Sequence, residues 1–190
     1  MKRSQMNAII ARSREIFQRH GWILPPNPKW DIVDFGYGNF EKFGLVLVNL
    51  AEEKEYCEKI MLVLQNQITC AHTHKQKKED IIARFGTLAI RLWDNAELKC
   101  GKPLTVRVNG VPREVISGDI VYITSGERIT LTQGLYHEFW AVGEYCVVGE
   151  VSTANDDKAD NFFAADDVSR FPPIEEDVPP LARLVWETEG

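Results

Sequence analysis

The first twenty residues carry apolar side chains at the spacing of a helix. The recurring apolar positions are Met6, Ile9, Ile10, Ile16 and Phe17. Ser4 stands where an N-cap is expected, and Gly21 follows as a stop signal. The pattern predicts an amphipathic helix whose apolar stripe packs on the body of the protein, with a dimer contact as the alternative. The prolines at Pro25, Pro26 and Pro28 then predict an extended stretch.

Beyond the prolines the pattern changes to short apolar and alternating runs that favour strands. The expected strands are Phe43–Leu50, Lys59–Gln67, Thr87–Trp93, Leu104–Val108, Val115–Ile116, Ile120–Ile123, Ile129–Leu131 and Tyr145–Val151. Glycines recur every six to nine residues from Gly101 to Gly149. Turn residues at that spacing between short apolar runs are typical of an antiparallel sandwich or barrel.

Composition and charge narrow the class of protein. The chain has 190 residues, of which 44% are hydrophobic and 26% are charged, too apolar for disorder and too charged for a membrane bundle. The net charge of −6 argues against nucleic acid or an anionic membrane as a partner. The four cysteines form no CxxC pair, so we expect reduced thiols and a cytoplasmic protein.

The charge is concentrated at the C-terminal end. Residues 144–190 carry twelve acidic and three basic side chains, and they include Pro172, Pro173, Pro179 and Pro180. This composition predicts an irregular acidic segment that wraps over the core. A regulatory or partner-binding tail is the alternative interpretation.

A histidine cluster is the candidate for chemistry. His72 and His74 are two residues apart, so on a strand both imidazoles would face the same side. Glu79 follows after four intervening residues, and His137 lies between two strand-like runs. Two imidazoles and a carboxylate suit a first-row divalent metal, and His137 is available as a fourth ligand. A solvated loop is the alternative for the His-x-His pair. His20 ends the first helix and is left out of the site.

The spacing His72-x-His74-x4-Glu79-x6-Gly86 resembles the first motif of the cupin superfamily. The stretch from Gly118 to Gly126 resembles the second motif, although Thr124 or Ser125 replaces its usual proline. The resemblance implies an all-β fold, a cupin double-stranded β-barrel or jelly roll. It implies a single domain over residues 1–190, with a helical and extended lead-in (1–42), a barrel (43–151) and an irregular acidic C-terminal wrap (152–190). It also implies a metal held by His72, His74, Glu79 and His137.

A narrower resemblance extends over most of the chain. Residues 131–140, 149–157, 160–162, 171–172 and 174–177 are similar to the D-lyxose ketol-isomerase family. This resemblance implies a metal-dependent aldose–ketose isomerase that interconverts D-lyxose and D-xylulose, and also D-mannose and D-fructose, through a metal-stabilised enediolate. It implies Mn²⁺, with Co, Fe, Ni or Zn as other choices, and a homodimer that takes a monosaccharide. An Fe(II) cupin dioxygenase and a non-catalytic sugar-binding cupin are the alternatives.

The same resemblance favours Glu150 and Lys59 as catalytic residues. Glu150 would act as the general base, and Lys59 would donate a hydrogen bond to a sugar oxygen. The alternatives are a salt-bridged or exposed Glu150 and a strand-end Lys59 that reaches water. Asp160, Gln65 and Arg170 are the candidates for binding sugar hydroxyls. A solvated loop is the alternative for the acidic run that contains Asp160.

Overall fold

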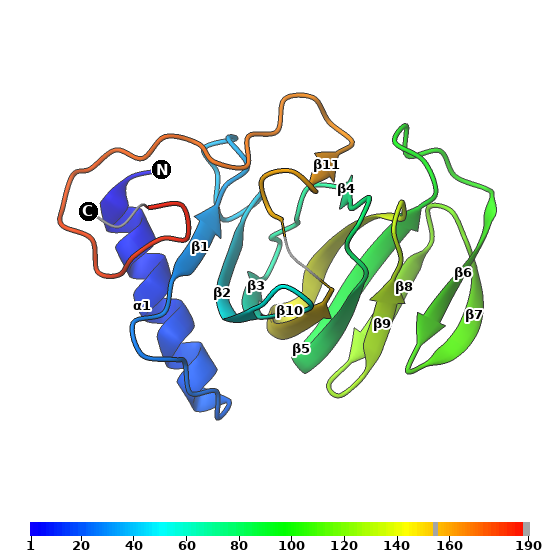
Figure 1. The fold of residues 1–190 in the computed structure, drawn as a ribbon, viewed down its shortest axis with the longest axis horizontal. Helices are drawn as coiled ribbons and strands as arrows, with labels where there is room; N and C mark the ends of the chain where they lie inside the picture. The colour runs from blue at the N-terminus through cyan, green and yellow to red at the C-terminus, as the bar shows by residue number, and fades with distance from the viewer. Residues whose placement is uncertain (154–155, 188–190) are drawn as a thin grey trace.

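The computed structural model describes residues 1–153 and 156–187 and is dominated by antiparallel strands (Figure 1). One helix precedes them. The elements are α1 (Arg3–Arg19), β1 (Trp30–Val33), β2 (Leu45–Glu52), β3 (Cys57–Leu64), β4 (His72–Thr73), β5 (Glu79–Trp93), β6 (Pro103–Val108), β7 (Val111–Ile116), β8 (Ile120–Thr124), β9 (Arg128–Leu131), β10 (Tyr136–Ser152) and β11 (Phe162–Phe163). The expected all-β fold is confirmed.

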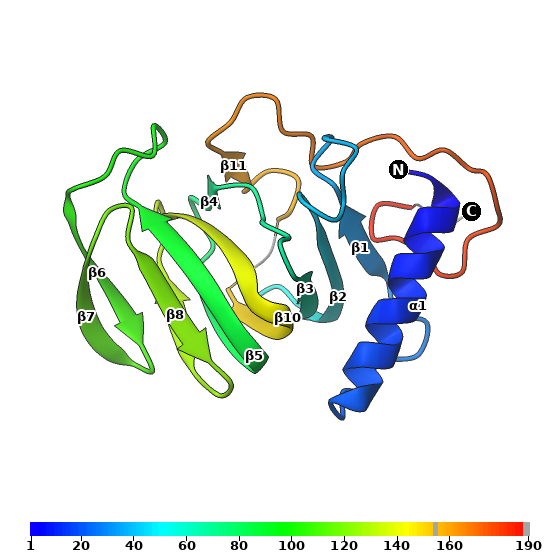
Figure 2. The ribbon, with the colours of Figure 1, turned by 180° about the vertical axis from the view of Figure 1, so that it is seen from behind.

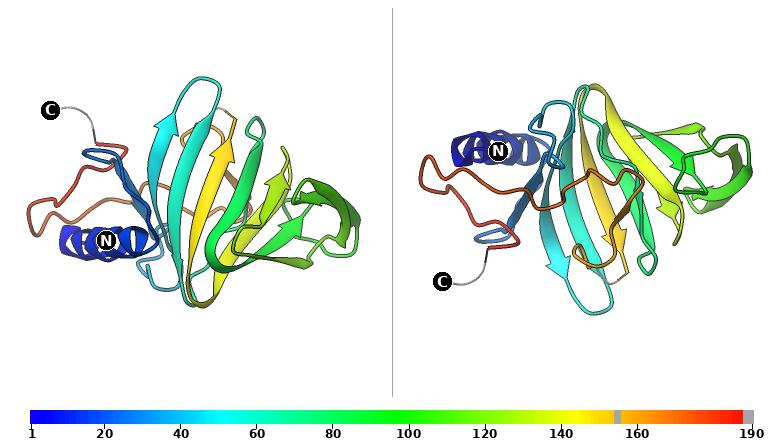
Figure 3. Two further views of the ribbon diagram at one scale, coloured as in Figure 1. Left: turned by 90° about the horizontal axis from the view of Figure 1, so that it is seen from below. Right: turned by 90° about the horizontal axis from the view of Figure 1, so that it is seen from above.

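The strands pair in the order β1-β2-β3-β10-β5-β9-β6-β7, with β8 on β5, and β4 between β10 and β11. Helix α1 flanks the β1 side, and the β6–β7 hairpin lies at the opposite end (Figures 1 and 2). Views along the perpendicular direction show the strongly twisted sheet between these two elements (Figure 3). This arrangement is consistent with a jelly roll.

Strands β5 and β10 form the spine of the sheet, and both are longer than the sequence pattern predicts. Each makes two successive pairings. Strand β5 pairs with β9 through its first half and with β8 through its second half. The register between β5 and β10 shifts around Val147. Gly86 adopts a φ of +85° there, and a Cβ would approach the Tyr145 carbonyl oxygen to 2.7 Å. Only glycine fits this bend without strain.

Two hydrophobic clusters hold the molecule together. One fills the interior of the barrel, with Met61, Ile90 and Phe139 among its members. The other lies between the outer face of the sheet and α1, where Ile10 and Phe17 are fully buried. The apolar stripe of the helix therefore packs on the body of the protein, as its spacing predicts.

The N-terminal region departs from the sequence predictions in two ways. Lys2, and not Ser4, occupies the N-cap position. Ser4 lies in the first turn, where its amide and hydroxyl both donate to the Asp177 carboxylate. A carboxylate from the C-terminal segment thus satisfies the helix start. The extended lead-in also contains β1, whose four consecutive buried residues show no alternation because α1 and the C-terminal segment cover its outer face.

The C-terminal segment follows an irregular path from β11 to the side of α1 (Figure 1). Its described residues bond to the start of the chain: Arg3 pairs with Glu176 and Glu187, and Asn7 donates to the Pro179 carbonyl. The described residues of this segment are irregular, as the sequence predicts, and they pack against the start of α1. None of the helices in the described part of the chain is long and apolar enough to cross a membrane.

Candidate metal centre and adjoining cavity

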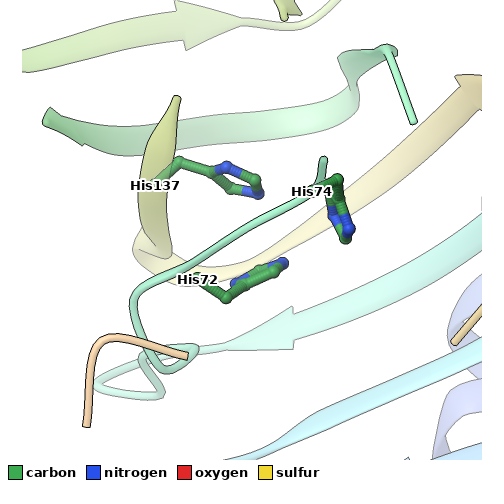
Figure 4. A group of neighbouring side chains, drawn as sticks. All are labelled: His72, His74 and His137. Atoms are coloured by element: carbon green, nitrogen blue, oxygen red, sulfur yellow. The ribbon is translucent and has the colours of Figure 1, made fainter. Parts of the chain in front are cut away.

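Three histidines converge inside the barrel (Figure 4). His72 belongs to β4 and pairs in register with His137 on β10, while His74 follows directly after β4. Their nearest ligand atoms all lie within 4.8 Å of one another. The expected strand holds only the first histidine of the His-x-His pair, yet the two imidazoles still reach one point.

Glu79 completes the group from the first position of β5. Its Oε1 atom lies 3.1 Å from His137 Nε2 and 3.6 Å from His74 Nε2. His74, His137 and Glu79 are all at most 5% exposed. Within the described structure, His74 Nε2 and Glu79 Oε1 are buried atoms without a hydrogen-bond partner. Buried polar atoms without partners are costly, so this arrangement suits a bound cation.

The outward-facing nitrogen of each imidazole contacts a backbone carbonyl oxygen. His72 Nδ1 lies 2.9 Å from the Cys70 oxygen. His74 Nδ1 lies 2.5 Å from the Asp160 oxygen, and His137 Nδ1 lies 3.3 Å from the Leu135 oxygen. Because a carbonyl oxygen only accepts, each Nδ1 must carry the proton. The Nε2 lone pairs are therefore directed at the common centre, as metal-ligating histidines require.

Burial and neighbouring charges favour the metal-binding protonation states. Burial, with the adjacent His137 and His74, holds the pKa of His72 well below its ordinary value. Burial likewise lowers the pKa of His74. Burial works to raise the pKa of Glu79, but the Lys77 ammonium group outweighs it and holds this pKa well below the usual range. The neutral imidazoles of His72 and His74 beside the Glu79 carboxylate are donors that fit a first-row divalent metal.

A cavity lined by charged groups adjoins this centre. Lys77 connects the two: its Nζ lies 2.8 Å from Glu79 Oε2 and 3.0 Å from Glu150 Oε1. Lys59 Nζ lies 3.7 Å from the same Glu150 oxygen and 3.3 Å from Asp157 Oδ1. Two ammonium groups therefore alternate with three carboxylates along one wall.

Both lysines remain cationic in this setting. Burial works to lower the pKa of Lys59, but the Glu150 and Asp157 carboxylates outweigh it and raise that pKa. Burial has the same effect on Lys77, and Glu150 and Glu79 raise its pKa above the ordinary value. The lysines can therefore donate hydrogen bonds but are poor bases.

The structure brings some of the expected sugar-binding residues to the cavity and not others. Arg170 lines it, with its guanidinium paired to Asp31. Of the described residues around the cavity, neither Asp160 nor Gln65 is a lining side chain. Asp160 is turned toward the chain itself: both carboxylate oxygens accept backbone N–H groups. Gln65 is exposed beyond the end of β3, in a separate hollow beside Glu144. Its placement follows from β3 ending at Leu64.

Sequence reasoning missed Lys77, Asp157 and Asn161, which all line the cavity. Lys77 stands in a lysine-rich stretch that resembles a solvated loop. In the folded chain Lys77 is only 5% exposed, whereas the nearby Lys75 is exposed, and the sequence alone does not distinguish the two. Asp157 and Asn161 belong to the acidic run in which Asp160 was favoured. No spacing rule distinguishes these carboxyl and amide groups, because the run is irregular.

Comparison with known proteins relates the sequence to one family. A model of the D-lyxose isomerase family matches residues 27–188. A D-lyxose/D-mannose isomerase of Escherichia coli O157:H7 is 36% identical over 221 aligned positions, which cover 97% of this chain and 96% of that protein. A protein with the same description from Serratia proteamaculans is 35% identical, with 98% and 97% covered.

Solved structures share the fold at much lower sequence identity. The L-ribose isomerase of Cellulomonas parahominis with L-ribose superposes with a TM-score of 0.66 at 14% identity, over 88% of this chain and 94% of that one. The L-ribose isomerase of Acinetobacter sp. DL28 in complex with L-ribose gives a TM-score of 0.67 at 14% identity, with the same coverage. Both likenesses support the barrel architecture described above.

Proposed function

The chain belongs to the D-lyxose isomerase family, and we propose that it interconverts D-lyxose with D-xylulose, and D-mannose with D-fructose, at a divalent metal centre. The observation that carries the proposal is the convergence of three Nε2 lone pairs and a Glu79 oxygen beside a cavity lined by charged groups. As a member of this family, the protein is an aldose–ketose isomerase that acts on a monosaccharide.

His72, His74, Glu79 and His137 would hold the metal. When bound, a divalent ion supplies Lewis acidity that stabilises the negative charge developing on sugar oxygens during isomerisation. We propose Mn²⁺ as the native ion, and Co, Fe, Ni and Zn accept the same donor set. Elemental analysis of protein purified without added metal tests this choice.

Glu150 is the proposed general base. Isomerisation moves a proton between C1 and C2 of the sugar, and a single carboxylate can accept it from one carbon and return it to the other. Glu150 is buried on the cavity wall, where its carboxylate can face a bound sugar. Lys59 and Lys77 both lie beside it, and their ammonium groups can donate to sugar oxygens. The raised pKa of Lys59 supports the role of donor for this residue and leaves the base role to Glu150.

Sugar hydroxyls would meet Asp157, Asn161 and Arg170, which replace Asp160 and Gln65 among the proposed binding residues. Phe35 and Phe163 supply an apolar face to the same cavity. Their rings contact each other edge to face, with the ring centroids 5.9 Å apart. A cavity with a few convergent polar groups and an apolar wall suits a small polyhydroxylated ligand.

Incubation with D-lyxose tests the proposal directly. Mn²⁺-loaded protein should form D-xylulose, and D-mannose should give D-fructose, both detected by chromatography. In deuterated water, transfer by Glu150 should place solvent deuterium on the product carbon, because a carboxyl proton exchanges with solvent. Absence of any ketose would overturn the isomerase assignment, and oxygen uptake with an organic substrate would favour an Fe(II) dioxygenase.

A homodimer and a cytoplasmic location are further proposals. The outer face of β5, β8 and β10 carries Trp140, Arg91 and the exposed Tyr122, and Trp, Arg and Tyr are enriched in protein interfaces. Sedimentation analysis tests the dimer. All four cysteines are free thiols, which fits a reducing compartment, and cell fractionation tests the location.

A further inference from the structure

The segment from Asp156 to Ala164 runs directly beside the metal-binding loop. Strand β11 pairs with β4, placing Phe163 opposite His72 and Phe162 opposite Thr73. The Ala164 amide continues this pairing by donating to the Ala71 carbonyl at 2.9 Å. The segment that supplies the cavity wall is therefore joined by backbone bonds to the chain that bears two metal ligands.

The Asp160 carboxylate holds three successive amides of that loop. Oδ1 accepts the N–H groups of Lys75 at 2.8 Å and Gln76 at 3.1 Å, and Oδ2 accepts that of Lys77 at 2.9 Å. Asp160 is only 4% exposed. Charge-assisted bonds from a buried carboxylate to consecutive amides fix the turn between His74 and Lys77.

The backbone of the same residue orients a ligand. The Asp160 carbonyl oxygen lies 2.5 Å from His74 Nδ1, so it fixes both the tautomer and the ring plane of His74. At the other end of the turn, Lys77 reaches Glu79 and Glu150. Asp160 thus contacts the chain on both sides of the turn and touches neither the cavity nor the metal position.

We propose that Asp160 is a positioning residue, which holds the 74–77 turn so that His74 faces the metal and Lys77 faces the two cavity carboxylates. The proposal rests on the proposed metal-dependent function. Without the carboxylate, the three amides lose their acceptor and the turn can move away from β11. The His74 ring would then lose its fixed orientation, and metal affinity would fall. Outer partners of metal ligands typically contribute about 10–100-fold to affinity.

Calorimetric titration of the full-length, metal-free protein with Mn²⁺, without sugar, tests this role. Asp160→Asn retains the shape of the side chain but replaces one carboxylate oxygen with an NH₂ group. That group cannot accept a hydrogen bond from a backbone N–H. We expect Mn²⁺ affinity to fall about 10–100-fold. Asp166→Asn, at an exposed carboxylate two residues beyond the segment from Asp156 to Ala164, is the matched control and should bind Mn²⁺ as the parent does. Unchanged affinity in Asp160→Asn would overturn the proposal.

A double-mutant cycle separates positioning from general loosening. In a His74→Ala background, Asp160→Asn should cause much less additional loss of Mn²⁺ affinity, because the ligand that it orients is already gone. An equal loss in both backgrounds would contradict positioning through His74. Amide exchange of the parent protein needs no variant: the N–H groups of Lys75, Gln76 and Lys77 should be protected, and rapid exchange would contradict the bonded turn.

The result can be told apart from a failure of the isomerase proposal. If Mn²⁺ binding depends on Asp160 but D-lyxose is not converted, the positioning role of Asp160 is supported and the proposed isomerase reaction is wrong. If D-lyxose is converted while Asp160→Asn keeps full Mn²⁺ affinity, only the positioning role falls.

Discussion

Lys59 and Glu150 lie directly opposite each other on β3 and β10, with Lys59 Nζ 3.7 Å from Glu150 Oε1 inside the barrel. Both are at most 5% exposed. A charged pair in the middle of a sheet is costly unless it is compensated, and Lys77 and Asp157 provide further opposite charges. The two proposed catalytic side chains are thus held by paired strands, which position groups more accurately than loops do.

Replacing Glu150 with glutamine should separate catalysis from metal binding. The amide has nearly the same shape but cannot accept a proton from carbon. We expect kcat to fall about 10²–10⁴-fold, with metal content unchanged because Glu150 is not one of the proposed ligands. Steady-state kinetics with D-lyxose and elemental analysis of the same sample check both parts.

Glu144→Gln is the matched control for that variant. Glu144 lies on the same strand, exposed near the register shift, and its amide form should turn over D-lyxose at the parent rate. Normal turnover in Glu150→Gln would move the base to another residue of the cavity.

Replacing His72 with alanine should abolish metal retention and activity together, because one of four proposed ligands is lost. Metal-to-protein ratio after gel filtration measures the effect. His20→Ala is the control: His20 stacks on Phe85 at 3.9 Å and bonds to the Tyr145 hydroxyl, outside the site. That variant should lose some stability but keep its metal. Full metal content in His72→Ala would contradict the ligand assignment.

Removal of the metal should destabilise the fold, because the ligands come from separate strands. His72 lies in β4, Glu79 in β5 and His137 in β10. At a free metal concentration of one hundred times Kd, binding to the native state alone contributes about 2.7 kcal/mol. Chelation should therefore lower Tm by roughly 5–10 °C for a chain of this length. A scanning calorimetry trace unchanged by a chelator would contradict a metal site that bridges these strands.

The sequence spacing predicts the grouping of side chains from which the proposed metal centre is built. His72, His74 and Glu79 belong to one short motif, and strand pairing brings His137 to them. The groups around that set depend on long-range contacts without a local pattern. The buried charge of Lys77, for example, is compensated by Glu79 and Glu150, which come from two strands, β5 and β10.

The fold shows the same division. The sequence pattern predicts where apolar residues form strands, but it underestimates β5 and β10, because Gly86 and the register shift around Val147 break the alternation. The short strands β4 and β11 carry too few residues for any periodicity. Their pairing requires the acidic C-terminal segment to lie beside β4. Composition predicts an irregular segment over the core, but it does not predict which of its residues pair with β4.

Replacing Arg170 with methionine should test how this C-terminal segment is anchored. The Arg170 guanidinium donates from both terminal nitrogens to Asp31 on β1, and Asp31 is only 1% exposed. Removing the cation leaves a buried carboxylate without its partner, which typically costs about 3–5 kcal/mol. Because Arg170 also lines the cavity, KM for D-lyxose should rise. The double variant Arg170→Met/Asp31→Leu removes both charges, so the free energy of unfolding measured in urea should largely recover while KM stays high. Recovery of both quantities would show that Arg170 acts only through the fold and does not contact the sugar.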